Sequence, residues 1–131
     1  MKPLQHLGYQ KTVDFYGCSK EKINSCNYVE TKLLEAARLM QLTVVNATIH
    51  KFSPIGVSGV IVIEESHIAI HTWPEHHYVA LDIFTCNSSY ELEKGIVFLT
   101  QAFEAQKKEE NDIARGDLNQ VKNLNSSIYE N

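Results

Sequence analysis

The sequence predicts an α+β fold, a two-layer sandwich in which helices cover one face of a single, mainly antiparallel sheet. Short apolar runs are separated by tight turns, and two longer segments repeat apolar residues at helical spacing. Two helices are too few to serve as crossovers between parallel strands, which leaves them as one layer on the sheet. The other face of the sheet is then free to pack against a partner subunit.

Strands are expected where β-branched and aromatic residues cluster or alternate with polar ones. The expected strands span residues 12–16, 42–52, 57–65, 67–73 and 78–85. Pro54 and Gly56 turn the chain between the second and the third. Residues 111–114 are a weaker candidate for an edge strand.

Two helices are expected from apolar residues that recur every three or four positions. The first runs from Asn27 to Met40, and Ser19 caps a short helical turn before it. The second extends to about Lys108. At its start, Ser88 followed three residues later by Glu91 has the spacing of a capping box. Its apolar stripe consists of Leu92, Ile96, Leu99 and Phe103.

One domain, residues 1–116, contains all of these elements, and residues 117–131 are expected to form a polar, mobile tail. The net charge of −4 and the scattering of 12 basic residues argue against nucleic acid or a membrane surface as a partner. The N-terminus shows no secretory leader and no apolar run approaches the length of a membrane span, so a cytoplasmic protein is expected. Three cysteines without a C-x-x-C pair argue against a disulfide framework.

A run of polar residues interrupts the apolar strands in the middle of the chain. Residues 64–67 read Glu-Glu-Ser-His, and strand alternation would turn at least two of them toward the buried face. Burial of an unpaired carboxylate is costly. Nearby, Ser58 lies between Gly56 and Gly59 in a stretch that permits close backbone approach. A strand edge or a bulge is the alternative, but the combination favours a functional site.

The histidines and Cys86 allow further interpretations. His67 and His71 are four residues apart, but in a strand this spacing separates them by about 13 Å, so no metal site is expected. A lone cysteine at a strand end is usually a small buried hydrophobic residue. With His71 nearby in the sheet, the Cys86 thiol could instead be a proton donor or a nucleophile, which keeps a Cys/His thiol hydrolase as a competing hypothesis.

Residues 52–86 read FSPIGVSGVIVIEESHIAIHTWPEHHYVALDIFTC, and residues 14–18 read DFYGC. This part of the chain contains a Pro-x-Gly-Val-Ser-Gly turn, Glu-Ser-His, Ile-His-Thr-Trp-Pro-Glu and Asp-x-Phe-Thr-Cys. Together these motifs resemble the prokaryotic S-adenosylmethionine decarboxylase proenzymes, over roughly residues 7–105. One departure is Gly8-Tyr9-Gln10, which stands where Gly-x-His is expected.

The resemblance implies a proenzyme that makes its own pyruvoyl cofactor from Ser66. In the family the serine hydroxyl attacks the preceding carbonyl, here that of Glu65, and elimination of the resulting ester releases residues 1–65. Residue 66 is left as a pyruvoyl group, whose carbonyl forms a Schiff base with the substrate amine and accepts electrons as carbon dioxide leaves. Strain is expected at the cut bond, because cleavage relieves it.

The resemblance also assigns roles to single residues at the matched positions. His71 corresponds to the histidine that takes the α-proton during processing, and Ser58 to the serine that supports it. Cys86 corresponds to the cysteine that reprotonates the substrate carbon. Phe52 corresponds to an aromatic residue that stacks on adenine.

The implied function is decarboxylation of S-adenosylmethionine to the aminopropyl donor of spermidine biosynthesis. Trp73 and Glu75 are expected to line the substrate site. The implied assembly is a homodimer of cleaved protomers, in which some site residues serve the neighbouring chain. One alternative is the same fold and cofactor acting on arginine or ornithine, with Glu75 or Asp14 binding the distal cation. Another is an unprocessed homologue that acts as a binding subunit.

Overall fold

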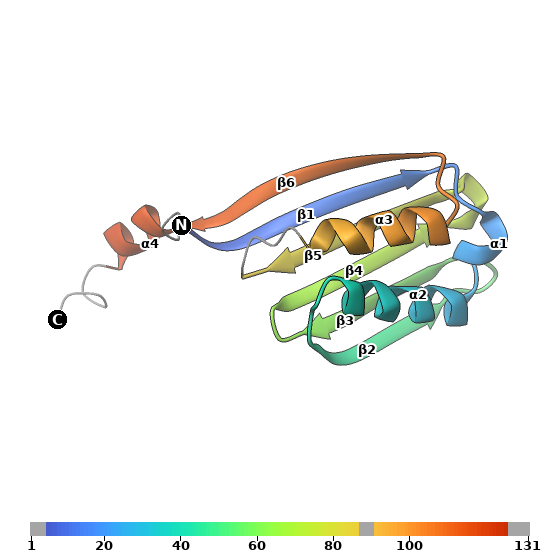
Figure 1. The fold of residues 1–131 in the computed structure, drawn as a ribbon, viewed down its shortest axis with the longest axis horizontal. Helices are drawn as coiled ribbons and strands as arrows, with labels where there is room; N and C mark the ends of the chain where they lie inside the picture. The colour runs from blue at the N-terminus through green and yellow to red at the C-terminus, as the bar shows by residue number, and fades with distance from the viewer. Residues whose placement is uncertain (1–4, 87–90, 126–131) are drawn as a thin grey trace.

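The computed structural model describes residues 5–86 and 91–125, and it confirms the predicted α+β class. A six-stranded antiparallel sheet with the order β2–β3–β4–β5–β1–β6 carries helices on one face (Figure 1). The strands are β1 (His6–Tyr16), β2 (Val44–Lys51), β3 (Val57–Ile63), β4 (Ser66–Trp73), β5 (Tyr78–Thr85) and β6 (Lys107–Asp117). The helical elements are α1 (Lys20–Ile23), α2 (Cys26–Leu39), the 3-10 turn η1 (Pro74–His76), α3 (Leu92–Ala102) and α4 (Leu118–Leu124).

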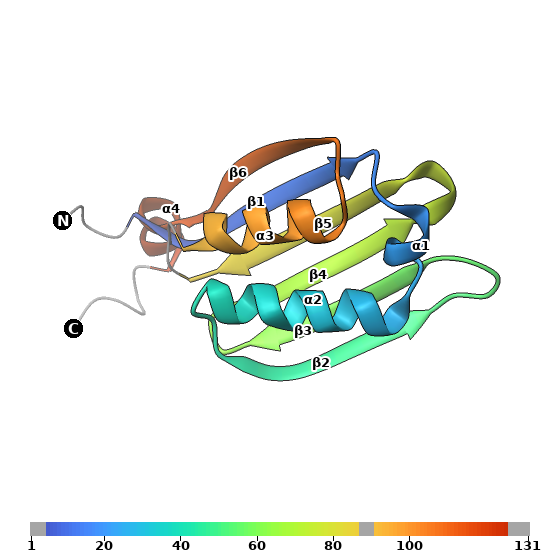
Figure 2. The same cartoon turned by 45° about the vertical axis from the view of Figure 1, so that its right-hand side comes forward.

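The core lies between the sheet and the two long helices, α2 and α3, which run side by side across it (Figure 2). Gly95 permits their close approach, because a Cβ atom there would lie 2.2 Å from the end of the Met40 side chain. Every second strand residue points into this layer, where burial of each large side chain contributes about 1.5–3 kcal/mol. Fully buried examples are Val13, Phe15, Leu33, Ile61, Ile70, Ile83, Ile96 and Leu99.

Serine hydroxyl groups cap the N-terminal ends of the first two helices. The Ser19 hydroxyl accepts a hydrogen bond from the Lys22 amide, as predicted. Ser25 caps α2 in the same way by accepting from the Tyr28 amide, so this helix begins slightly earlier than Asn27. The predicted capping box at Ser88 lies outside the described residues.

Three predicted boundaries are wrong. The second long helix ends at Ala102 rather than near Lys108, because the chain reverses at Glu104 with φ of +56° and then enters β6. The weak edge strand expected at 111–114 is the eleven-residue β6. The first strand begins at His6, not at residue 12, because β1 pairs with β6 along its length.

In the long β1–β6 pair, β6 consists mainly of charged and polar residues, which give no apolar signal. Lys11 forms ion pairs with Glu110 (3.2 Å) and Asp112 (2.9 Å) of β6, and Lys108 pairs with Glu110 (2.9 Å). The two ion pairs of Lys11 join residues about a hundred positions apart, so local periodicity could not reveal them. Beyond β6, helix α4 buries none of its residues, and mobility of the tail stays a prediction. No described helix is long and apolar enough to cross a membrane.

The strand order interleaves the parts of the chain before and after residue 65. Strand β1, from the first part, lies between β5 and β6 of the second part, and β3 of the first part pairs with β4 of the second. Three ladders therefore connect the two parts. A break between β3 and β4 would leave a folded sheet whose two fragments remain joined by these ladders and by the common core.

Candidate functional site

The polar run of residues 64–67 forms a hairpin turn and the start of the following strand. Glu64 and Glu65 are its two loop residues, and Ile63 pairs with Ser66 across them. The prediction that at least two residues of this run face the core is therefore wrong. Glu64 is exposed and the other three are half-buried. Glu64 and Glu65 lie in the turn, outside the strand alternation, whereas Ser66 and His67 begin β4, where only Ser66 shares the face of the buried Ile68.

The main chain of Ser66 is strained. Its φ of +149° lies in a region that is essentially confined to glycine, and occupying it costs a residue with a side chain about 1–3 kcal/mol. Ser66 is the first residue of β4 and directly follows the Glu65–Ser66 peptide bond. The strain thus lies at the residue for which the resemblance implies cleavage.

The turn before Ser66 is held by residues from two other segments. The carbonyl oxygen of Glu65 accepts hydrogen bonds from the Cys86 amide (3.1 Å) and from the Cys86 thiol (3.2 Å). The Glu65 carboxylate accepts from the amide (3.1 Å) and hydroxyl (3.4 Å) of Thr43, and the Glu64 amide donates to the Thr43 carbonyl (2.9 Å). Two donors on one carbonyl favour negative charge on its oxygen, as in an oxyanion hole. We name Glu65, Ser66 and Cys86 the cleavage group.

Ser58 and His71 meet at the other end of β4. They are directly opposite each other in the β3–β4 ladder, and the Ser58 hydroxyl lies 2.8 Å from Nδ1 of His71. Trp73 follows on the same strand, with its ring centroid 6.2 Å from that of His71 and 5.4 Å from that of Tyr78. The serine–histidine contact is therefore present within a single chain.

The predicted substrate residues lie at this same end. Phe52 follows the last residue of β2, is 46% exposed, and contacts the His50 ring edge-on at 4.6 Å. Trp73 is 40% exposed, and Glu75 is exposed in η1. We name this second set the histidine group: Phe52, Ser58, His71, Trp73 and Glu75.

The cleavage group and the histidine group are separated within a single chain. Ser66 pairs with Ile63 at the turn, whereas His71 pairs with Ser58 five residues further along the strand. At 3.3–3.4 Å per residue this spacing is about 17 Å. Figure 1 shows the β3–β4 turn and the β4–β5 connection at opposite ends of the sheet. One copy of the chain does not bring His71 to Ser66.

The face of the sheet opposite the helices, which we name the open face, carries a chain of hydrogen bonds that the sequence analysis missed. Arg115 donates to the side-chain oxygen of Gln10 (2.8 Å), and Gln10 donates to Asp82 (2.8 Å). The second oxygen of Asp82 lies 3.0 Å from Nε2 of His67. Alternation of Asp82 with the buried Leu81 and Ile83 was the available signal for its place on this face.

Asp14 is already engaged on the open face. Its carboxylate accepts a hydrogen bond from the hydroxyl of Tyr78. Burial, and then this bond, raise the pKa of Tyr78, so the hydroxyl remains a donor at neutral pH. Of the two carboxylates considered for a basic substrate, Asp14 thus has a protein partner, whereas Glu75 is exposed in η1.

His67 and His71 hold different partners, Asp82 and Ser58 respectively. Across residues 5–86 and 91–125, no group of three or more His, Cys, Asp or Glu side chains is arranged to hold a metal ion.

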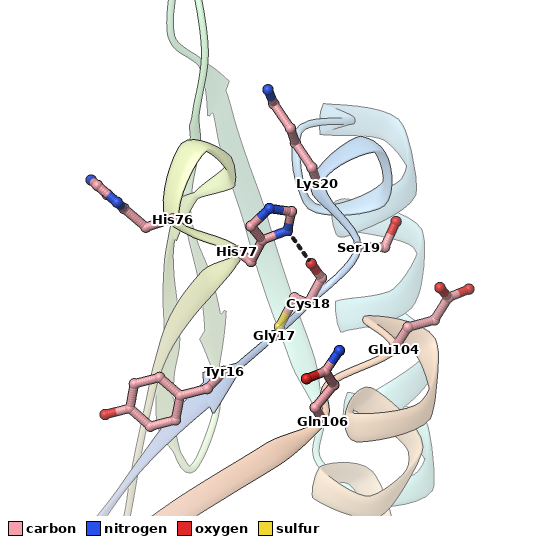
Figure 3. A pocket seen from close by; sticks show the side chains of 9 residues that line it. All are labelled: Tyr16, Gly17, Cys18, Ser19, Lys20, His76, His77, Glu104 and Gln106. Carbon is pink, nitrogen blue, oxygen red and sulfur yellow. Dashed lines mark hydrogen bonds between the residues drawn. The ribbon is translucent and has the colours of Figure 1, made fainter.

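A pocket of about 690 Å³ opens beside η1, but it contains none of the predicted site residues (Figure 3). His77 closes one side, with Nδ1 2.8 Å from the carbonyl oxygen of Cys18. Burial raises the pKa of the Cys18 thiol to about 11, so this cysteine is a packing residue rather than a nucleophile. The remaining lining residues are Tyr16, Gly17, Ser19, Lys20, His76, Glu104 and Gln106.

Comparison with known proteins identifies the class. The sequence model of the family described as S-adenosylmethionine decarboxylase matches residues 9–116. S-adenosylmethionine decarboxylase proenzymes of Acidithiobacillus ferrooxidans and Fervidobacterium nodosum are 40% and 38% identical over 90% of this chain, and 89% and 86% of their own lengths are covered. The crystal structure of the adenosylmethionine decarboxylase from Aquifex aeolicus superposes with a TM-score of 0.80 at 27% identity, over 88% of this chain and 95% of that one. The chain belongs to the S-adenosylmethionine decarboxylase family.

The strain at Ser66 leads to a prediction about stability. Ser66→Gly should be more stable than Ser66→Ala by about 1 kcal/mol, because glycine adopts φ of +149° without a clash. Neither variant has a hydroxyl, so neither is expected to cut itself and two intact chains are compared. Urea denaturation measures the difference. At an ordinary strand position alanine is more stable than glycine. A Ser66→Ala variant more stable than Ser66→Gly would therefore show that the Ser66 main chain is not strained.

Proposed function

We propose that the chain is a proenzyme that cuts itself between Glu65 and Ser66, and that Ser66 becomes its pyruvoyl group. The activity follows from family membership: the chain is an S-adenosylmethionine decarboxylase, a carboxy-lyase of polyamine biosynthesis, as the sequence predicted. The main support for self-cleavage is the strained main chain of Ser66, which lies next to a carbonyl group that accepts two hydrogen bonds from Cys86.

The residues present fit the formation of a pyruvoyl group. The Ser66 hydroxyl attacks the Glu65 carbonyl carbon, the new C–O bond replaces the C–N bond, and the hydroxyl proton passes to the Ser66 nitrogen. The Cys86 amide and thiol stabilise the charge on the carbonyl oxygen during this step. Breaking the amide also frees Ser66 to leave its unfavourable φ, which favours the ester.

Elimination needs a base for the α-proton of Ser66, and His71 is suited to this role. When Nδ1 donates to the Ser58 hydroxyl, Nε2 carries the free lone pair and can accept a proton. Loss of the proton expels Glu65 as a carboxylate and leaves dehydroalanine at position 66. Hydrolysis of this residue yields the pyruvoyl group and ammonia.

Cys86 has a second role after cleavage. The pyruvoyl carbonyl, once formed, supplies the electron sink for loss of carbon dioxide. Departure of the Glu65 carbonyl removes the acceptor that holds the Cys86 thiol, which stays adjacent to residue 66 and can donate a proton to the substrate. The exposed rings of Phe52 and Trp73 offer stacking surfaces for the adenine, and Glu75 offers a carboxylate.

A homodimer completes the site in this proposal. His71 lies about 17 Å from Ser66 along its own strand, so it can act on Ser66 only in a second copy. A two-fold axis across the middle of β4 would place the histidine group of one protomer against the cleavage group of the other, twice. Stacked sheets lie about 10 Å apart, a distance that side chains from both can bridge.

The open face supports this arrangement. Val60 and Val62 of β3 project from it and are 42% and 44% exposed, although they alternate with fully buried neighbours. An aromatic row, in which Tyr78 packs against both Trp73 and Tyr16, continues across three strands. Such exposed apolar residues on a face without helices are typical of an interface between subunits.

Intact-mass spectrometry and a carbon dioxide release assay test the proposed function. The purified protein should consist of residues 1–65 and of residues 66–131 with a blocked N-terminus, and Ser66→Ala should stay uncut because no β-oxygen remains. The cleaved protein should release carbon dioxide from S-adenosylmethionine. Release from arginine or ornithine, with none from S-adenosylmethionine, would support the alternative substrate, and an uncut wild type would overturn the proposal.

Cys86→Ala should separate cleavage from decarboxylation. The amide donor to the Glu65 carbonyl survives this substitution, so cleavage should continue and slow by no more than about tenfold, the value of one lost hydrogen bond. Turnover should fall far more, because the proton donor is gone, and the residual reaction should leave an amine on residue 66 that intact mass detects. Unchanged turnover would exclude Cys86 as the donor.

Mixing two inactive variants tests the shared site. Ser66→Ala lacks the attacking hydroxyl and His71→Ala lacks the base, so each alone should stay unprocessed. In a mixed dimer, His71 of the Ser66→Ala copy can serve Ser66 of the other copy. Co-expression should therefore yield cut chains that all carry His71→Ala, as mass spectrometry can show.

The control is each variant expressed alone under the same conditions. Failure of the mixture to process, in samples that size-exclusion chromatography shows to contain mixed dimers, would contradict the sharing of His71 between protomers.

A further inference from the structure

His67, the residue that directly follows the proposed cut, is anchored by its side chain. Its Nε2 lies 3.0 Å from Asp82 of the neighbouring strand β5. Its ring stacks on Phe84 of the same strand, with centroids 5.9 Å apart and an interplanar angle of 18°. A hydrogen bond and a ring stack together restrict both the position and the orientation of this side chain, although it is 39% exposed.

The acceptor of this bond is itself held from the other side. Gln10 of β1 donates to the second oxygen of Asp82, and Gln10 accepts from Arg115 of β6. The chain of contacts from His67 therefore crosses β5, β1 and β6. All four strands belong to one sheet, so the anchor point of His67 is part of the sheet and not of a loop.

Ser66 is consequently held between two supports. On its N-terminal side, the turn is held by Thr43 and Cys86; on its C-terminal side, His67 is held by Asp82 and Phe84. A residue relaxes from an unfavourable φ only if the chain on one side of it moves. With both sides held, φ of +149° can persist in the intact chain.

We propose that His67 is a positioning residue for self-cleavage, which holds Ser66 in the strained conformation from which the acyl shift proceeds. This inference rests on the proposed self-cleavage. The amide and the ester are in equilibrium before elimination, and strain in the amide raises the ester fraction. Release of the His67 anchor lets the amide relax and lowers that fraction.

The ester fraction can be measured without decarboxylase activity. In a His71→Ala background elimination is blocked, so the ester persists. Hydroxylamine attacks the ester carbonyl, forms a hydroxamate on Glu65 and releases the Ser66 hydroxyl, which cuts the chain; the amide does not react under mild conditions. The extent of cutting, read by intact mass, then reports the ester.

The double variant His67→Ala/His71→Ala should be cut about tenfold less than His71→Ala alone, a factor within the strain expected for such a φ. His67→Gln should recover part of the cutting, because its amide can donate to Asp82. Asp82→Ala should reproduce the loss while leaving the His67 ring in place, which keeps the test valid if His67→Ala folds poorly. His76→Ala, a matched change at an exposed histidine of η1, should have no effect.

The outcomes separate this inference from the function on which it rests. No hydroxylamine cutting in His71→Ala itself would overturn the ester mechanism and this inference with it. Equal cutting in His71→Ala and in the folded double variants with His67→Ala or Asp82→Ala would overturn the positioning role alone. A thermal unfolding curve for each variant distinguishes the expected loss of cutting from a general loss of structure, which would lower cutting in His67→Gln as much as in His67→Ala.

Discussion

The register of β4 between β3 and β5 is the constraint on which the rest of the site depends. It places Ser66 opposite Ile63 on one side and Thr85 on the other. Cys86 directly follows Thr85, and its amide therefore reaches the carbonyl oxygen of Glu65. The same register places His71 opposite Ser58. A shift by one residue would move all of these side chains to the other face of the sheet. Buried Ile68 and Ile70 oppose such a shift, because they would lose their place in the core.

The division of the site between the ends of β4 has a physical consequence. Under the proposed mechanism each end alone lacks part of the chemistry: the proposed nucleophile Ser66 and the donors to the Glu65 carbonyl lie at one end, and the proposed base His71 and the aromatic rings lie at the other. In the proposed dimer, processing depends on assembly, because Ser66 meets a base only when two copies associate. After the proposed cleavage the interleaved strands would keep the two fragments together, since three ladders join the parts before and after residue 65.

Strain and support are combined at one residue. A φ of +149° at a serine persists only when the surrounding contacts outweigh its cost. Here those contacts come from Thr43, Cys86 and, through His67, from Asp82.

The sequence by itself determined the layer architecture and most of the elements. Apolar alternation identified β3, β4 and β5, helical periodicity identified α2, and the Ser19 cap was read correctly from one hydroxyl. These features are local, since they depend on residues a few positions apart. The motifs from Phe52 to Cys86 indicated the family for the same reason, because they lie in one continuous stretch.

Only the tertiary structure decided the rest. The length of β6 and the contacts of Glu65 with Thr43 and Cys86 depend on segments about 20 to 100 residues apart. The distance between Ser66 and His71 also needed the fold, because five residues span about 17 Å in a strand but about half of that in a helix. Local pattern reports which residues are apolar, whereas pairing between distant strands decides which polar residues meet.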